Sequence, residues 1–305
     1  KVRGFQTITG NINVDRTFPT TGNVNRSNTV KLLKDVTENV TIPSGKTITL
    51  DLNGHILINE TNSHTVTVKG TLTVSDTSTS NGGTIKSDKN CGICVQGGTL
   101  TFESGKVESQ EMAILLIDAG TATINGGTFT AKDNAVLGTN GTKDRGGNTL
   151  TVNGGTFNGN NQTSGYVACG IYVANNDNVT LNGGTFNITG GAGIVQRAGT
   201  VSIPENSSVV FKTTGNSKGK VGDSRVVVPC SAIVFDSAAN YPGMGEDSKI
   251  SVTGGTFISA SGTPAVTLVP SDGTSDAKRI DLDGGTYSDD TGNDGRAVLP
   301  QGKAL

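Results

Sequence analysis

The chain has 305 residues, of which 33% are hydrophobic and 4% aromatic, and its composition of 44 glycines and no tryptophan cannot fill a large globular core. A formal net charge of −2 and many Val, Ile and Thr residues argue against intrinsic disorder, which usually combines low hydrophobicity with high net charge. A nearly neutral chain offers no basic field to nucleic acid, and no apolar run approaches the roughly 18 residues that span a membrane. We therefore expect no nucleic-acid partner and no membrane insertion.

The N-terminal part predicts a cap followed by the first coils of a repeat. Residues 1–27 show no regular pattern and are expected to form an irregular cap, with a single domain over 28–305. The segment from Val30 to Leu57 alternates apolar and polar residues and predicts entry coils, with a turn at Pro43-Ser44-Gly45. A start at Lys1 without a signal peptide suggests a fragment of a longer polypeptide, so we expect further domains in the same protein.

From residue 82 onward a Gly-Gly-Thr motif recurs. A loose copy begins at Gly82, and five copies in which an aromatic residue follows begin at Gly126, Gly154, Gly183, Gly254 and Gly284. The intervals between these five are 28, 29, 71 and 30 residues, so the long one must contain a degenerate coil with an insertion. A fixed period of this length predicts a repeat architecture.

Each repeat contains three short strand patterns. The first alternates before the glycines, and the second carries one large apolar residue after them: Ile85, Val107, Phe129, Phe157, Phe186, Phe257 and Tyr287. The third places an Ile or Val after a small residue, and its aligned members are Ile93, Ile114, Val136, Ile171, Ile194, Ile233, Val266 and Val298.

The return of each apolar position once per repeat decides the fold. Three antiparallel hairpins would not bring equivalent residues back to one place, whereas a coil that climbs one strand spacing of about 4.8 Å per turn does. Asn-Gly-Gly supplies a positive-φ corner between the first two strands. The sequence therefore predicts an all-β fold, a single-stranded right-handed parallel β-helix with three strands per coil and about nine coils.

Four cysteines invite a redox or metal interpretation. Cys91 and Cys94 have C-x-x-C spacing, but Cys169 and Cys230 do not repeat it, and no predicted helix lowers a thiol pKa. We expect buried cysteines that act as small hydrophobic residues, and we expect neither a metal site nor a cofactor.

Together, "TIPSGKTITLDLNGHIL", the repeated "VNGGTF" and the "GIYV"-type strands resemble pectin-lyase-like β-helix regions of large surface proteins from Gram-positive gut bacteria. The resemblance covers the chain from about residue 29 onward. It implies an extracellular protein, secreted or attached to the cell wall, with relatives among adhesins, glycan binders and some glycoside hydrolases. The histidines, His55 and His64, both fall in the first full coil, and the polygalacturonase and pectate lyase motifs are not assembled. Those two activities are disfavoured.

The turn after each third strand is the richest in polar residues. Tyr172 is predicted to face outward between Leu137 and Val195, where its ring beside amides and carboxylates would suit a sugar. The predicted ligand-binding residues are Tyr172, Asn175, Asp177, Arg197, Asp236 and, in the insertion of coil seven, Tyr241. The structural alternative is that the Asp and Asn residues form turns and that Arg197 pairs with an acid at the surface.

Three functions remain open on the sequence. The first is a non-catalytic surface module that binds a glycan or adheres to a host surface polymer through a flat flank. The second is a glycoside hydrolase, which needs two carboxyls about 5–9 Å apart, with the candidate acids Asp118, Asp144 and Asp177. The third is a structural spacer without a ligand.

Overall fold

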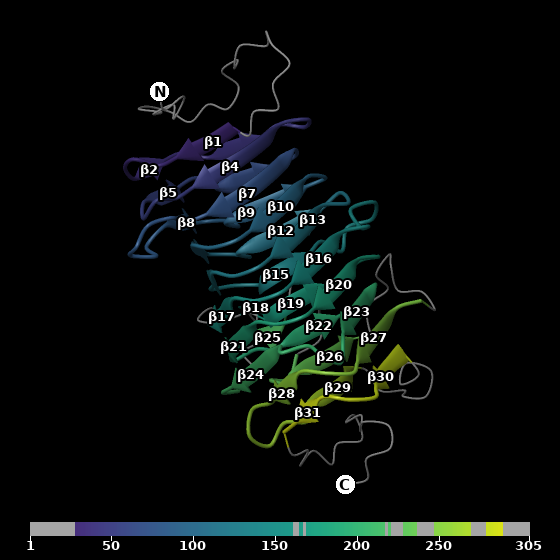
Figure 1. The fold of residues 1–305 in the computed structure, drawn as a ribbon. Helices are drawn as coiled ribbons and strands as arrows, with labels where there is room; N and C mark the ends of the chain where they lie inside the picture. The colour runs from purple at the N-terminus through teal and green to yellow at the C-terminus, as the bar shows by residue number, and fades with distance from the viewer. Residues whose placement is uncertain are drawn as a thin grey trace.

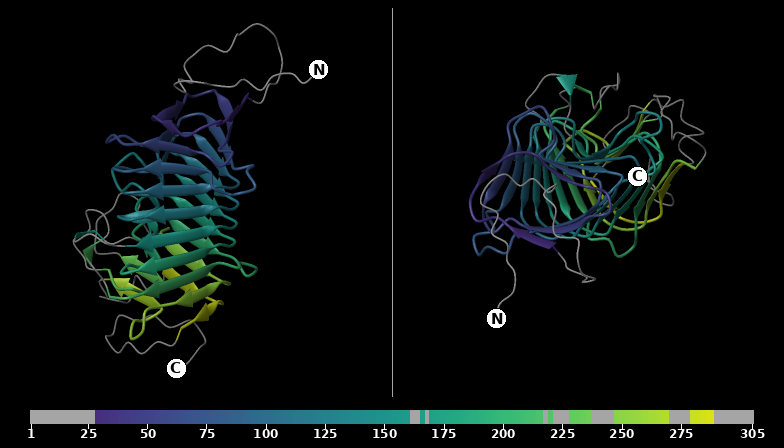
Figure 2. Two further views of the ribbon diagram at one scale, coloured as in Figure 1. Left: turned by 90° about the vertical axis from the view of Figure 1, so that its left-hand side faces the viewer. Right: turned by 90° about the horizontal axis from the view of Figure 1, so that it is seen from above.

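The structure is a computed structural model, and it describes residues 28–160, 165–166, 169–216, 219–220, 228–236, 247–269 and 279–288. Within these ranges the chain forms short strands and no α-helix. The strands lie one below another along an elongated stack, with the first coils at one end and the last coils at the other (Figure 1, Figure 2).

Three parallel sheets form the walls of the stack, and every third strand along the chain belongs to the same sheet once the two strands of a separate short pair are left aside. The first sheet contains β1 (Asn28–Lys31), β4 (Thr47–Asp51), β7 (Thr71–Ser75), β10 (Thr99–Phe102), β13 (Thr121–Ile124), β16 (Thr149–Val152), β20 (Asn178–Leu181), β23 (Thr200–Ile203), β27 (Lys249–Val252) and β30 (Ile280–Leu282). The second contains β2 (Val36–Thr37), β5 (Ile56–Asn59), β8 (Thr84–Ser87), β11 (Lys106–Ser109), β14 (Thr128–Ala131), β17 (Thr156–Asn160), β21 (Thr185–Thr189), β24 (Val210–Thr214), β28 (Thr256–Ile258) and β31 (Thr286–Tyr287).

The third sheet contains β3 (Val40–Ile42), β6 (Val66–Val68), β9 (Ile93–Gln96), β12 (Ile114–Ile117), β15 (Ala135–Thr139), β19 (Cys169–Val173), β22 (Ile194–Gln196), β26 (Ile233–Asp236) and β29 (Val266–Val269). A separate pair, β18 (Gly165–Tyr166) with β25 (Gly219–Lys220), joins two connections between the second and third sheets. This topology confirms the predicted right-handed parallel β-helix with three strands per coil.

A column of aromatic rings runs through the core. Neighbouring ring centroids lie 4.9 Å apart for Phe129–Phe157, 4.2 Å for Phe157–Phe186 and 4.4 Å for Phe186–Phe211, with nearly parallel planes. The rings are fully buried, and burying one contributes on the order of 2–3 kcal/mol. The sequence predicted this column but missed Phe211, since no Gly-Gly-Thr precedes it.

Both glycines of the corner motif are required by the geometry. The second glycine has φ of 100° at Gly127, 109° at Gly155 and 101° at Gly184, which confirms the predicted positive-φ corner. The first glycine lies against the coil before it, because a Cβ atom at Gly183 would be 2.5 Å from the carbonyl oxygen of Asn153. A larger residue at either place would push neighbouring coils apart.

The third sheet corrects one predicted register. Leu137, not Val136, pairs with Ile114 and Ile171. Leu137 follows Phe129 by eight residues, the same interval that separates Ile93 from Ile85 in an earlier coil. At this interval Leu137 points into the core, and Gly138 takes the outer place opposite Tyr172. Leu137 is therefore not the outer neighbour of Tyr172 that the sequence suggested.

Candidate functional site

The structure brings three residues of the predicted edge together with Asn148 between the third and first sheets. Gln196 pairs with both Val173 and Phe235, which places the turns of three successive coils in one row. We call the group formed there by Asn148, Asp177, Arg197 and Asp236 the polar corner. All four side chains are buried.

Burial corrects the expectation that Arg197 and Tyr172 lie at the surface. Arg197 is 0% exposed, and its Nη2 donates to Asp236 Oδ2 at 2.5 Å inside the protein. The guanidinium carbon lies 5.8 Å from the centre of the Tyr172 ring, an arrangement in which an aromatic face stabilises a cation. Tyr172 packs with Val195 and Val228 in a second apolar cluster outside the coil core. In the described part of the chain, these buried side chains pack against the outer side of the third sheet and stabilise it.

Asp177 is held by the coil before it. Its Oδ1 accepts from the backbone N–H of Asn148 at 3.0 Å and from the Asn148 amide at 2.8 Å. The same amide donates to the carbonyl of Arg145, while its oxygen accepts from the N–H of Gly120. Burial raises the pKa of Asp177, and the hydrogen bonds from Thr139 and Asn148 oppose that rise. Asn148, which sequence reasoning missed, thus connects three coils.

The other predicted residues occupy different settings. Asp118 is partly exposed and accepts from the Gln96 amide at 3.0 Å, with Arg145 at 3.5 Å. Asp144 lies in an exposed turn with φ 67°. The Asn175 amide is buried and donates to the carbonyl oxygens of Asn140 and Thr142 in the preceding coil. Tyr241 lies outside the described residues.

The cysteines are buried, as predicted, and no disulfide joins them. Burial raises the pKa of Cys94 to about 12, and it raises the pKa values of Cys91 and Cys169 as well. Thiols in this state are poor nucleophiles at neutral pH. Among the described residues, no three His, Cys, Asp or Glu side chains are grouped so that they could hold a metal ion.

The outer surface of the first sheet carries a regular array of threonines, which we call the threonine face. Consecutive members pair Cα to Cα across neighbouring strands. One row contains Thr47, Thr71, Thr99, Thr121 and Thr149; the second contains Thr49, Thr73, Thr101, Thr123, Thr151 and Thr180. Their side chains are exposed or partly exposed, while the residues between them point into the core. The sequence signal for this face is the T-x-T pattern in β4, β7, β10, β13 and β16, which was missed because it contains no charged residue.

An exposed asparagine ladder borders the threonine face. The Asn182 amide donates to Asn153 at 2.8 Å, Asn153 donates to Asn125 at 2.8 Å, and Asn125 donates to the Glu103 carboxylate at 3.0 Å. All of these hydrogen bonds run in one direction and end on a charge, which strengthens a chain of hydrogen bonds. The asparagine ladder gives the corner a fixed row of amide groups.

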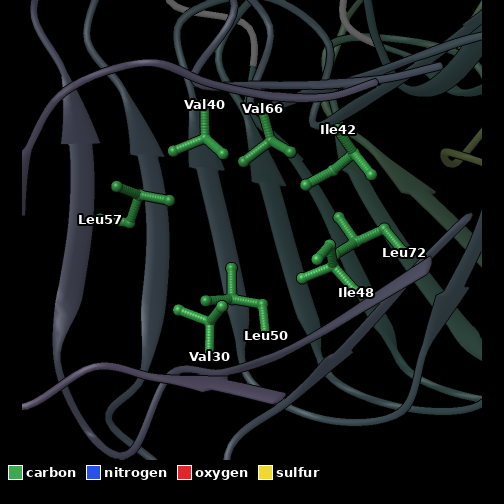
Figure 3. Close-up of a pocket in the computed structure, with 8 residues that line it drawn as sticks. All are labelled: Val30, Val40, Ile42, Ile48, Leu50, Leu57, Val66 and Leu72. Atoms are coloured by element: carbon green, nitrogen blue, oxygen red, sulfur yellow. The ribbon is translucent and has the colours of Figure 1, made fainter. Parts of the chain in front are cut away.

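The first coils contain an apolar hollow inside the stack, shown in Figure 3. Its lining is entirely aliphatic and consists of Val30, Val40, Ile42, Ile48, Leu50, Leu57, Val66 and Leu72. Binding sites for small molecules usually add a few placed polar groups that orient the ligand. Because this lining has none, we interpret the hollow as part of the core.

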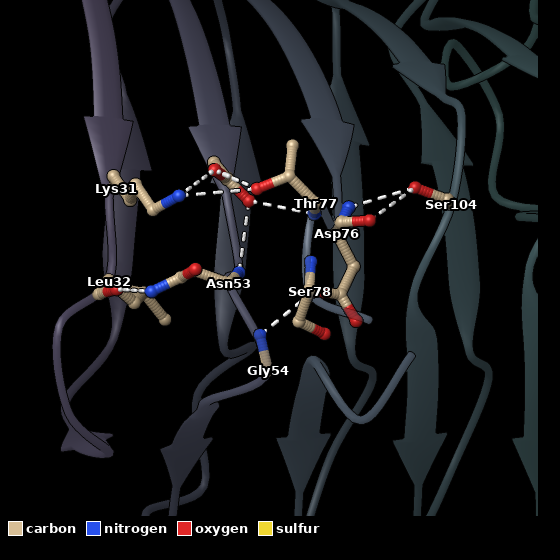
Figure 4. A network of polar contacts seen from close by, with 9 residues as sticks. Lys31, Leu32, Asn53, Gly54, Asp76, Thr77, Ser78 and Ser104 are labelled. Carbon is tan, nitrogen blue, oxygen red and sulfur yellow. Dashed lines mark hydrogen bonds and ion pairs between the residues drawn. The ribbon is translucent and has the colours of Figure 1, made fainter. Parts of the chain in front are cut away.

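A polar network closes the corners of the same coils (Figure 4). Asp51 accepts from the N–H of Asn53, from the N–H and hydroxyl of Thr77, and from Lys31 at 3.2 Å. Burial raises the pKa of Asp51, but the bonds from Thr77 and Lys31 outweigh it and leave the pKa below its ordinary value. Asp76 repeats the pattern by accepting the N–H groups of Gly54, Ser78 and Gly83. The network satisfies backbone donors and is structural.

No family model, curated protein or solved structure matches this chain. No helix in the described part of the chain is long and apolar enough to cross a bilayer.

Proposed function

We propose that this chain is a non-catalytic extracellular surface module that binds carbohydrate. The observation that supports it is the exposed surface of hydroxyl and amide groups made by the threonine face and the asparagine ladder. Hydroxyl and amide groups both donate and accept hydrogen bonds, as the hydroxyls of a glycan require. Their repetition in successive coils suits a polymer, because many weak contacts add up when they are linked.

The setting is proposed on the sequence motifs alone. We place the chain in a pectin-lyase-like region of a surface protein from a Gram-positive gut bacterium, secreted or attached to the cell wall, with a glycan or host surface polymer as its partner. An adhesive role fits a rigid stack that presents the same groups along its length.

Binding is favoured over glycoside hydrolysis by the places of the candidate acids. Hydrolysis needs two carboxyls that face the same sugar. Of the three candidate acids, Asp177 is 1% exposed and is engaged by Asn148, so it does not reach a substrate in this structure. Asp118 is already engaged by Gln96 and Arg145. This leaves Asp144, in an exposed turn, as the one candidate acid without such a partner among the residues that the structure describes.

A glycan array together with a hydrolysis assay on the same purified chain tests the proposal. We expect binding without release of shorter sugars. Product release that disappears in Asp177→Asn would support the hydrolase instead. If the chain neither binds nor hydrolyses any glycan, the result would support the structural spacer.

A further inference from the structure

The threonine face is a two-row lattice with fixed spacings. Along the stack, equivalent threonines repeat at the strand spacing of about 4.8 Å, and within a strand the two rows are about 6.6–6.8 Å apart. Five successive strands from β4 to β16 carry both rows, and Thr180 extends the second row by one coil. The lattice is therefore much longer along the stack than across it.

The chemistry of the threonine face selects a neutral partner. Each threonine offers a methyl group and a hydroxyl that donates and accepts hydrogen bonds. Charged side chains on this sheet's outer surface occur toward its ends, at the Lys31–Asp51 ion pair between β1 and β4 and at the Lys249–Asp281 ion pair between β27 and β30. Glu103 lies at the end of the asparagine ladder, beside the lattice. The lattice between the two ion pairs is uncharged, whereas an anionic polymer would be expected to meet lysine or arginine.

The long direction of the lattice selects an extended partner. A pyranose ring in an extended polysaccharide advances by a distance close to one strand spacing, so a chain lying along the stack meets an equivalent threonine pair at each ring. A chain lying parallel to the strands would meet only the two rows. The asparagine ladder runs parallel to the same direction and adds amide groups at its edge.

We infer that the threonine face binds a neutral, extended polysaccharide that lies along the stack, with about one sugar ring per coil. The inference rests on the proposed carbohydrate-binding function and gives it a substrate class and a binding mode. Each threonine contributes weakly, and affinity arises from the number of coils engaged. Binding should therefore strengthen with oligosaccharide length until the lattice is filled.

The test uses the whole chain in affinity gel electrophoresis with mixed-linkage β-glucan and glucomannan as neutral probes and polygalacturonate as the charged probe. The variant Thr123→Val/Thr151→Val/Thr180→Val removes three hydroxyls from adjacent strands but keeps their shape and strand propensity. Its matched control, Thr128→Val/Thr156→Val/Thr185→Val, makes the same change in the same coils on the second sheet. Circular dichroism checks that both variants fold.

We expect retardation by a neutral probe, at least about tenfold weaker binding in the threonine-face variant, and a change within about twofold in the control. Equal binding by both variants, or retardation by polygalacturonate alone, would overturn the inference. If the glycan array shows a ligand but neither neutral probe binds, the inference fails while the proposed function stands. If the glycan array shows no ligand, both the inference and the proposed function fail. Self-association that the threonine-face variant abolishes in sedimentation velocity would assign the face to a second copy and also overturn the inference.

Discussion

The threonine face and the polar corner lie on adjacent sides of the same coils, yet their polar groups act in opposite ways. On the threonine face, hydroxyls repeat in register and remain open to solvent. In the polar corner, each buried group has its own partner, as Arg197 has Asp236 and Asp177 has Asn148. The comparison teaches that polarity at a predicted edge does not by itself mark a binding site, since burial decides what the groups can reach.

The largest expected effect comes from breaking the buried ion pair. Asp236→Ala leaves the Arg197 guanidinium buried without its carboxylate and should lower the free energy of unfolding by about 3–5 kcal/mol. Urea denaturation measures the change. The double variant Arg197→Met/Asp236→Leu should recover most of the loss, because well-packed apolar pairs often replace buried ion pairs. A double variant as unstable as the single one would show that the corner needs the charges themselves.

Removing the link between coils should have the next largest effect. Asn148→Ala removes the buried side-chain hydrogen bonds to Gly120, Arg145 and Asp177 and should cost about 2–3 kcal/mol. Asn153→Ala, at an exposed place in the asparagine ladder, is the matched control and should cost less than about 1 kcal/mol. Equal losses in the free energy of unfolding would mean that the buried Asn148 and the exposed Asn153 stabilise the protein alike, which would contradict the difference between the polar corner and the asparagine ladder.

Opposite pH dependences should separate two buried aspartates. The pKa of Asp177 is raised in the folded state, so the protein loses stability from this group as the pH rises above the ordinary value of about 4. The pKa of Asp51 is lowered, so its stabilisation is present above about pH 4 and is lost as the pH falls through the folded value. Asp177→Asn should therefore gain stability relative to wild type as the pH rises from about 4 to 7, and Asp51→Asn should be less stable than wild type above about pH 4 and approach it as the pH falls below that value. Urea midpoints across this range that move in the same direction for both variants would contradict the assignment.

The smallest effect is expected on the threonine face. Thr151→Ala should change the free energy of unfolding by no more than about 0.5 kcal/mol, because its hydroxyl faces solvent. Thermal unfolding followed by circular dichroism measures this change. A loss near that of Asn148→Ala would give the threonines a structural role and weaken the case for a binding surface.

The sequence predicted what repeats and missed what occurs once. Phe129, Phe157 and Phe186 were readable because the same corner precedes each of them. Phe211 was missed because its coil lacks that corner. Leu137 was missed because the pattern of a small residue followed by Ile or Val selected Val136, although the eight-residue interval from Phe129 points to Leu137.

The candidate site shows the same limit. Alternation predicted that Tyr172 lies outside the coil core, and the second cluster agrees. Its burial depends on segments distant in sequence, such as Val228, which packs into that cluster from the long connection between β24 and β26. A period-two pattern tells which way a side chain points, but not whether another part of the chain covers it.

The return of the chain to an equivalent place after each coil is tested most directly by a double-mutant cycle between Phe157 and Phe186. The two rings are 4.2 Å apart although their residues are 29 positions apart in sequence. With Phe157→Leu, Phe186→Leu and the double variant, urea unfolding should give a coupling energy of about 0.5–1.5 kcal/mol. A coupling energy of zero would mean that the rings are not neighbours and would contradict the stacked architecture and every surface derived from it.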